Sequence, residues 1–140
     1  MNGVRGRVAG VLGLVLLIAL GCAGDGTRIP GQMMGSGTTL ATLQTDIFTP
    51  FCSPCHQPGG IGPMPLDNEA ATFLSLVDED SLGIPSLKRV LPFKPEQSYL
   101  VWKIEGRMGI VGDPMPLGGP MLSQDRIDEI RDWIDGGALP

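Results

Sequence analysis

Apolar residues recur at helical spacing in two stretches of the chain, one before its midpoint and one near its end. The first set falls at i, i+3, i+7 and i+8, which places side chains on one face of a helix: Leu40, Leu43, Ile47 and Phe48. The second set is also amphipathic: Ile127, Ile130, Trp133 and Ile134. Ser123 is placed to cap this second helix, and Gly136-Gly137 would end it. We therefore expect two helices that pack through these faces.

Two shorter helices are predicted between these stretches. One covers residues 68–77, with Asn68 or the aspartate before it as its N-cap. The other covers residues 96–104, with Pro95 in its first turn and Gly106 at its end. The intervening segments are rich in glycine and proline and have no alternating strand pattern. The expected fold class is all-α, with short helices and long loops.

The first 21 residues have the pattern of a bacterial export signal. Arg5 and Arg7 form a basic start, and an apolar run over residues 8–20 follows. This run is too short and too rich in glycine for a membrane span. It ends at Ala19-Leu20-Gly21-Cys22, which resembles the lipobox of bacterial lipoproteins. We expect cleavage before Cys22 and lipidation of that cysteine, with an ordinary cleaved signal as the alternative.

These features divide the chain into a signal peptide over residues 1–21, a flexible tether over 22–37 and one domain over 38–140. Glycine, serine and proline leave the tether with little to pack. Lipid on Cys22 would anchor the protein to a membrane. The expected location is the periplasmic side of a bacterial cell membrane, either the inner or the outer one.

The mature chain would be acidic. The full sequence has a formal net charge of −5 at pH 7, and loss of Arg5 and Arg7 with the signal lowers it to −7. There is no basic cluster, which argues against nucleic acid as a partner. A protein partner with a basic or neutral docking face fits this charge better.

The stretch Cys52-Ser53-Pro54-Cys55-His56 has the C-x-x-C-H pattern of covalent haem attachment. Two thiols at this spacing can each add to one vinyl group of the same porphyrin, and the adjacent imidazole becomes the proximal iron ligand. A thioredoxin-type dithiol would need a βαβ frame that the sequence does not show, and structural zinc would need four ligands. The expected cofactor is one haem c, bound through Cys52, Cys55 and His56.

The second axial position cannot be taken by another histidine of this chain, because His56 is the only one. A methionine, a lysine, water or an empty position remains open. Four methionines follow His56: Met64, Met108, Met115 and Met121. Prolines on both sides of Met115 stiffen its loop, which would hold a thioether at little ordering cost. The same Pro-Met-Pro-Leu sequence, however, surrounds Met64.

The order of these features resembles class I cytochrome c. A helix runs into C-x-x-C-H, and a long loop, short helices, a methionine-containing loop and an amphipathic helix follow. Three further segments resemble a branch of small bacterial cytochrome c domains: residues 67–71, 95–100 and 115–120. The resemblance covers most of residues 38–140.

This resemblance implies that Met115 is the axial ligand, ahead of the three other methionines after His56. It also implies that Phe48 meets Trp133 where the first and last helices cross. The chain would then be a membrane-tethered one-electron carrier that serves redox partner proteins, and not an enzyme. The alternatives are a haem module of a larger membrane-bound oxidoreductase complex, or an open-site haem protein that binds a diatomic ligand.

Two further groups of residues have a functional and a structural interpretation. Tyr99, Trp102 and Trp133 could donate hydrogen bonds to a haem propionate, but their helical spacing favours core positions. The run Asp78-Glu79-Asp80 fits a solvated turn better than a metal site.

Overall fold

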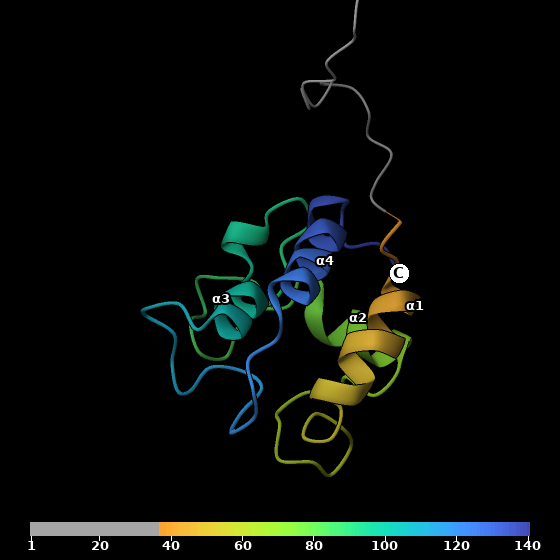
Figure 1. The fold of residues 1–140 in the computed structure, drawn as a ribbon. Coiled ribbons are helices and arrows are strands. Elements are labelled where there is room, and N and C mark those ends of the chain that lie inside the picture. Colours follow the sequence, from red (N-terminus) through yellow and green to blue (C-terminus); the bar gives the residue numbers. More distant parts are fainter. Residues whose placement is uncertain (1–36) are drawn as a thin grey trace, which may run out of the picture. The chain divides into compact units, whose positions relative to one another are not determined.

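The computed structural model describes residues 37–140, which belong to one compact unit, Met33–Pro140. Regular structure in this part is helical, with isolated β-bridges and no strand, so the described residues are all-α as predicted (Figure 1). None of the helices within 37–140 is long and apolar enough to cross a membrane. The predicted signal peptide, the lipidated Cys22 and the tether up to residue 36 lie outside the described residues.

Six helical segments follow one another along residues 37–140. They are α1 (Leu40–Leu43), η1 (Gln44–Cys52), α2 (Glu69–Leu76), η2 (Pro95–Gln97), α3 (Tyr99–Glu105) and α4 (Gln124–Asp135). η1 is a π-helix that continues α1 without a break, and η2 is a short 3₁₀-helix. α4 contacts both α1 and α3, and α2 packs beside α1 (Figure 1). The first and last helices thus form the centre of the fold.

The two predicted helical faces meet in the core, and all eight of their apolar residues are buried. The rings of Phe48 and Trp133 lie edge to face, with centroids 6.5 Å apart and planes at 75°, which confirms the predicted contact. The indole Nε1 of Trp133 donates to the carbonyl of Leu139 at 2.7 Å. This bond satisfies the buried indole and holds the last residues against α4.

Most of the predicted helix ends are confirmed. Asn68 caps α2, because its Oδ1 accepts a hydrogen bond from the Ala71 amide at 3.0 Å. Gly106 ends α3 in the left-handed conformation, with a φ of 64°, which glycine adopts at no steric cost. Ser123 is the N-cap residue of α4, but its side chain makes no capping hydrogen bond.

The prediction of one helix over residues 96–104 is wrong. Ser98 has an extended backbone, with φ −95° and ψ 117°, and separates η2 from α3. Its Oγ donates to the carbonyl of Lys94 and accepts from the amide of Leu91, both at 2.9 Å. A serine that bonds to nearby backbone in this way competes with helical hydrogen bonding. The helix therefore begins again at Tyr99.

The acidic run over residues 78–80 is exposed, as predicted for a solvated turn. Asp80 pairs with Lys88 at 2.7 Å, and the run gathers no further ligand into a metal site within residues 37–140.

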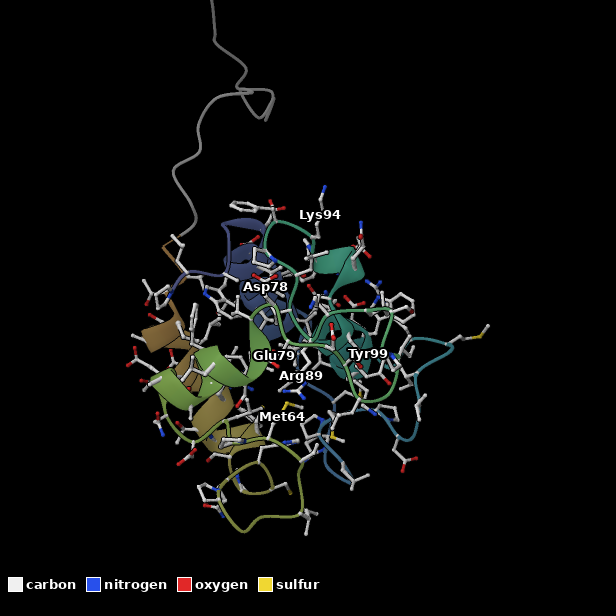
Figure 2. All side chains as sticks on the ribbon, turned by 180° about the vertical axis from the view of Figure 1, so that it is seen from behind. Met64, Asp78, Glu79, Arg89, Lys94 and Tyr99 are labelled. Atoms are coloured by element: carbon white, nitrogen blue, oxygen red, sulfur yellow. The ribbon has the colours of Figure 1, made fainter. Side chains whose placement is uncertain are left out.

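Figure 2 shows Lys94, from the segment before η2, extending away from the molecule at the end opposite Met64. Lys94 is exposed.

Two arginines and two glutamates link η2, the end of α3 and α4. Arg107 and Arg131 each pair with both Glu96 and Glu105. The hydrogen bond from Arg131, followed by the one from Arg107, lowers the pKa of Glu96. Because Glu96 is exposed, we expect this group to add little to stability and to weaken as the salt concentration rises.

A buried glutamine joins the start of η1 to α2 and to the loop after the C-x-x-C-H motif. Gln44 is 6% exposed, and its Nε2 donates to the carbonyl of Leu66 and to Thr49 Oγ1, both at 3.1 Å. Its Oε1 accepts a hydrogen bond from Thr72 Oγ1 at 2.7 Å. One side chain therefore satisfies polar groups from three parts of the chain, as buried polar groups require.

We expect Gln44→Leu to destabilise the protein by about 1–3 kcal/mol, because it leaves the Leu66 carbonyl and the Thr72 hydroxyl buried without a partner. Denaturant unfolding measures the loss. Gln97→Leu is the matched control, since Gln97 is exposed and its side chain makes no hydrogen bond within the described residues. Equal stabilities for the two variants would contradict a stabilising role for the network.

Candidate cofactor site

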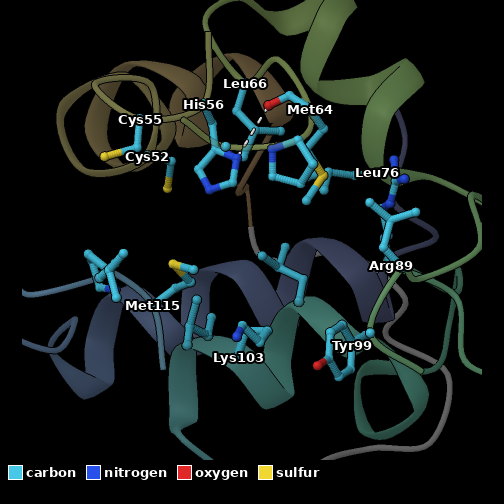
Figure 3. A pocket seen from close by; sticks show the side chains of 18 of the residues that line it. Cys52, Cys55, His56, Met64, Leu66, Leu76, Arg89, Tyr99, Lys103 and Met115 are labelled. Carbon is cyan, nitrogen blue, oxygen red and sulfur yellow. Dashed lines mark hydrogen bonds between the residues drawn. The ribbon is translucent and has the colours of Figure 1, made fainter. Parts of the chain in front are cut away.

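A cavity of about 330 Å³ opens beside the core and is lined mainly by apolar side chains. This volume falls in the range of roughly 300–1,000 Å³ that is typical of small-molecule and cofactor sites. Four exposed apolar residues contribute to its lining: Ile61, Leu82, Val111 and Leu117. Cys52, Cys55, His56 and Met115 also line it, so the structure brings the predicted site residues to one cavity (Figure 3).

The C-x-x-C-H motif forms the turn that follows the π-helix. Cys52 is the last residue of η1, and the amides of Cys55 and His56 both donate to its carbonyl, at 3.1 and 2.9 Å. Cys52 and Cys55 are free thiols and half-buried. π-helical turns occur frequently at functional sites, where they shift the side chains that follow. Here the π-helix delivers the motif to the wall of the cavity.

The imidazole of His56 is held from behind by the loop that follows it. Its Nδ1 lies 3.3 Å from the carbonyl oxygen of Met64, which can only accept, so Nδ1 carries the proton. In the neutral ring the lone pair is then on Nε2, the nitrogen that faces the cavity in Figure 3. Burial lowers the pKa of His56, and the Met64 hydrogen bond partly opposes that shift. The site therefore favours a neutral imidazole that can bind a metal ion.

A glycine makes this imidazole position possible. A Cβ at Gly62 would lie 2.3 Å from His56 Nδ1 and 2.6 Å from Cε1, so no larger residue fits there without moving the ring. The loop is further fixed by two backbone hydrogen bonds: the amide of Gly62 donates to the carbonyl of Cys55 at 2.8 Å, and that of Leu66 donates to the carbonyl of His56 at 2.7 Å. His56 and its supporting loop form one unit.

The four candidate methionines have different environments. Met108 is 96% exposed and Met121 is 47% exposed, and neither lines the cavity. Met64 and Met115 both line it. Figure 3 shows Met64 on the same side as His56, and Met115 on the facing wall. Of the four sulfurs, that of Met115 is the one placed to approach a group from the side opposite His56.

Four polar side chains that line the cavity come from outside the motif: Ser81, Arg89, Tyr99 and Lys103. Arg89 donates from one guanidinium nitrogen to the carbonyl of Ser75 at 2.6 Å. Its Nε is buried and has no hydrogen-bond partner among the described residues. A buried donor without a partner costs free energy unless a bound group accepts from it. Arg89 thus places a guanidinium among lining residues that are mostly apolar.

Among the aromatic candidates, only Tyr99 lines the cavity. The indole Nε1 atoms of Trp102 and Trp133 donate to the carbonyls of Glu96 and Leu139, each at 2.7 Å. Sequence reasoning did not single out Arg89 or Lys103 as site residues. Neither belongs to a motif, and long-range folding alone brings them to the cavity.

Burial raises the pKa of the Cys52 thiol to about 12. The thiol therefore stays protonated at neutral pH, and its reactivity as a thiolate is suppressed. This does not suit a redox dithiol, which depends on a low thiol pKa. It does not suit zinc either, which binds the thiolate, and within residues 37–140 no three His, Cys, Asp or Glu side chains converge to hold a metal ion.

Comparisons with family models, with curated proteins and with solved structures give no match to this chain.

The donor set of the cavity fits a covalently attached haem. Two thiols and an imidazole nitrogen lie on one wall, and a thioether lies on the facing wall (Figure 3). The guanidinium of Arg89 can donate to an acidic substituent, and most of the remaining lining is apolar, as a porphyrin face requires. The residues present are therefore compatible with the cofactor that the motif predicts.

We expect Gly62→Ala to displace the imidazole and to destabilise the protein by about 1–3 kcal/mol, the usual cost of overpacking. Because the chain has one histidine, the ring gives a single set of NMR signals that reports its position. Gly119→Ala is the control, since a Cβ there would meet Pro116 at an ordinary 3.7 Å. Unmoved His56 signals in Gly62→Ala would contradict the close approach.

In the chain without haem, Cys52 should resist alkylation at pH 8. Its thiol has a pKa of about 12 where an ordinary thiol has 9.0, so its thiolate fraction is roughly a thousandfold smaller. Unfolding restores the ordinary pKa of the thiol. The raised pKa therefore contributes to the free energy of unfolding below pH 9, and this contribution is lost as the pH rises from 9 towards 12. Mass spectrometry of native and urea-unfolded chains treated with iodoacetamide measures the alkylation rate of Cys52. Equal rates in both states would contradict the burial of the thiol.

Proposed function

We propose that the chain is a monohaem c-type cytochrome, a membrane-tethered one-electron carrier whose haem iron has His56 and Met115 as axial ligands. One observation carries the proposal: the three motif residues and Met115 line the same cavity, with the imidazole and the thioether on facing walls (Figure 3). No iron ligand beyond this pair is required for a six-coordinate site. A closed coordination sphere suits electron transfer better than substrate binding.

Bound haem would supply an iron that alternates between Fe(II) and Fe(III). The thiols of Cys52 and Cys55 would each add sulfur and hydrogen across one vinyl double bond, so attachment consumes no oxidant. His56 would bind the iron through Nε2, with Nδ1–H kept on the Met64 carbonyl. The guanidinium of Arg89 would donate to an acidic substituent at the cavity edge. Methionine opposite histidine raises the reduction potential.

We also propose a class I cytochrome c fold for residues 38–140. Support comes from the order of elements: a helix that enters C-x-x-C-H, a loop that covers the histidine, a methionine segment opposite it, and a last helix that crosses the first. The edge-to-face contact of Phe48 with Trp133 at that crossing agrees with the resemblance. Lipidation of Cys22, with location on the periplasmic side of a membrane, belongs to the same proposal.

Optical spectra of the protein made with a c-type maturation system test the function. We expect a low-spin ferrous spectrum that carbon monoxide leaves unchanged, and a weak far-red band of sulfur-ligated ferric haem. A high-spin spectrum that shifts with carbon monoxide would instead support an open-site haem protein. His56→Ala should abolish stable haem incorporation, and normal holoprotein yield in that variant would refute the attachment site.

Met115→Ala should lower the reduction potential and open the iron to carbon monoxide, because the thioether is lost. Met108→Ala is the matched control, since Met108 is 96% exposed and lies outside the cavity. Potentiometric titration and carbon monoxide difference spectra measure both effects. If Met115→Ala behaves like Met108→Ala, the sixth ligand is a different group, and Met64→Ala is then the next variant to measure.

A further inference from the structure

We propose that α3 acts as a clamp on the segment over residues 106–115, and that Tyr99 and Lys103 hold Met115 on the cavity wall. They would be positioning residues, which act on the iron site through Met115. The inference rests on the proposed function for its effect on haem, but the contacts that carry it belong to the chain itself. It identifies which residues decide whether the position opposite His56 is closed.

Four hydrogen bonds join α3 to residues 111–115 of this segment. The Lys103 ammonium donates to the carbonyls of Val111, at 3.0 Å, and Asp113. The amide of Met115 donates to the backbone carbonyl of Lys103 at 2.8 Å. The amide of Val111 donates to the hydroxyl of Tyr99 at 2.9 Å. About one turn of helix thus binds the segment at three alternate positions, Val111, Asp113 and Met115.

Beyond Arg107, which pairs with Glu96 and Glu105, the segment has few other contacts that hold it. Residues 111–114 are exposed, Met108 is 96% exposed, and Gly109 and Gly112 have positive φ values of 92° and 71°. Within the described residues, the backbone amides from Met108 to Asp113 make no hydrogen bond to another backbone group. A stretch this exposed and rich in glycine opens locally at low free energy unless side chains hold it. The contacts to Tyr99 and Lys103 therefore control its order.

Both clamp residues are built into the fold. Tyr99 is 8% exposed, and a Cβ at Gly83 would lie 2.5 Å from its hydroxyl oxygen, so glycine leaves the space in which the hydroxyl sits. Lys103 forms no ion pair with a carboxylate among the described residues, and its ammonium donates to carbonyl oxygens. An ammonium that donates to carbonyls makes charge-assisted hydrogen bonds, which are stronger than neutral ones.

The test compares carbon monoxide binding by the ferrous holoprotein with amide hydrogen exchange. In Lys103→Met the segment loses both ammonium bonds, and we expect a roughly tenfold rise in apparent carbon monoxide affinity, because the competent open state is more populated. Exchange at the amides of Val111 and Met115 should accelerate. Lys103→Arg can still donate to carbonyls and should restore much of both properties. Tyr99→Phe should accelerate exchange mainly at the amide of Val111, which loses its acceptor.

Lys94→Met is the control, since Lys94 is exposed, does not line the cavity and extends away from the molecule (Figure 2). If Lys103→Met and Tyr99→Phe both match this control in exchange and in carbon monoxide affinity, the clamp is overturned. If exchange accelerates but neither variant, nor Met115→Ala, changes carbon monoxide binding, the clamp stands, and the failure belongs to the proposed Met115 ligand. Tyr99→Phe also keeps the test open should Lys103→Met fail to fold.

Discussion

The hydrogen bond between His56 Nδ1 and the Met64 carbonyl is the constraint on which the site depends. It decides which ring nitrogen keeps its proton, and so which nitrogen faces the cavity. The bond requires the loop after the motif to return closely over the ring, which Gly62 permits and the Leu66 amide secures. Gln44 then connects Leu66 to α2. The orientation of one imidazole thus draws on contacts that reach from the π-helix to the second helix.

The two walls of the cavity are stabilised in different ways. The wall that carries the motif rests on backbone hydrogen bonds and a buried polar network. The wall that carries Met115 is an exposed segment fastened to α3 by side chains. Buried networks give a fixed geometry, whereas exposed segments open more readily. In the proposed carrier, His56 would remain in place while any opening of the iron site occurs on the side of Met115.

Much of the fold could be predicted from local patterns, and much of the site could not. The helical faces follow from spacing, because an apolar face that repeats every three or four residues must be buried. The motif is recognisable because its chemistry is local. Ser98 breaks a predicted helix through bonds to Leu91 and Lys94, which spacing does not reveal. Arg89 reaches the cavity only through long-range folding, and no local signal marks it.

The paired Pro-Met-Pro-Leu segments show the same limit in another way. Local sequence cannot distinguish Met64 from Met115, since both are bracketed by the same residues. Their places in the fold differ, because one follows the motif directly and the other follows α3 (Figure 3). Only the three-dimensional arrangement places one sulfur beside the histidine and the other across from it.

The apolar residues that line the cavity and remain exposed have a consequence for how the protein is made. A bound cofactor would partly cover the apolar surface of four of them: Ile61, Leu82, Val111 and Leu117. Uncovered surface of this kind promotes association between molecules. In the proposed cytochrome, the interval between export of the chain and haem attachment would therefore be the period in which it is most prone to aggregate. Rapid cofactor loading would protect the yield of protein as well as supply its chemistry.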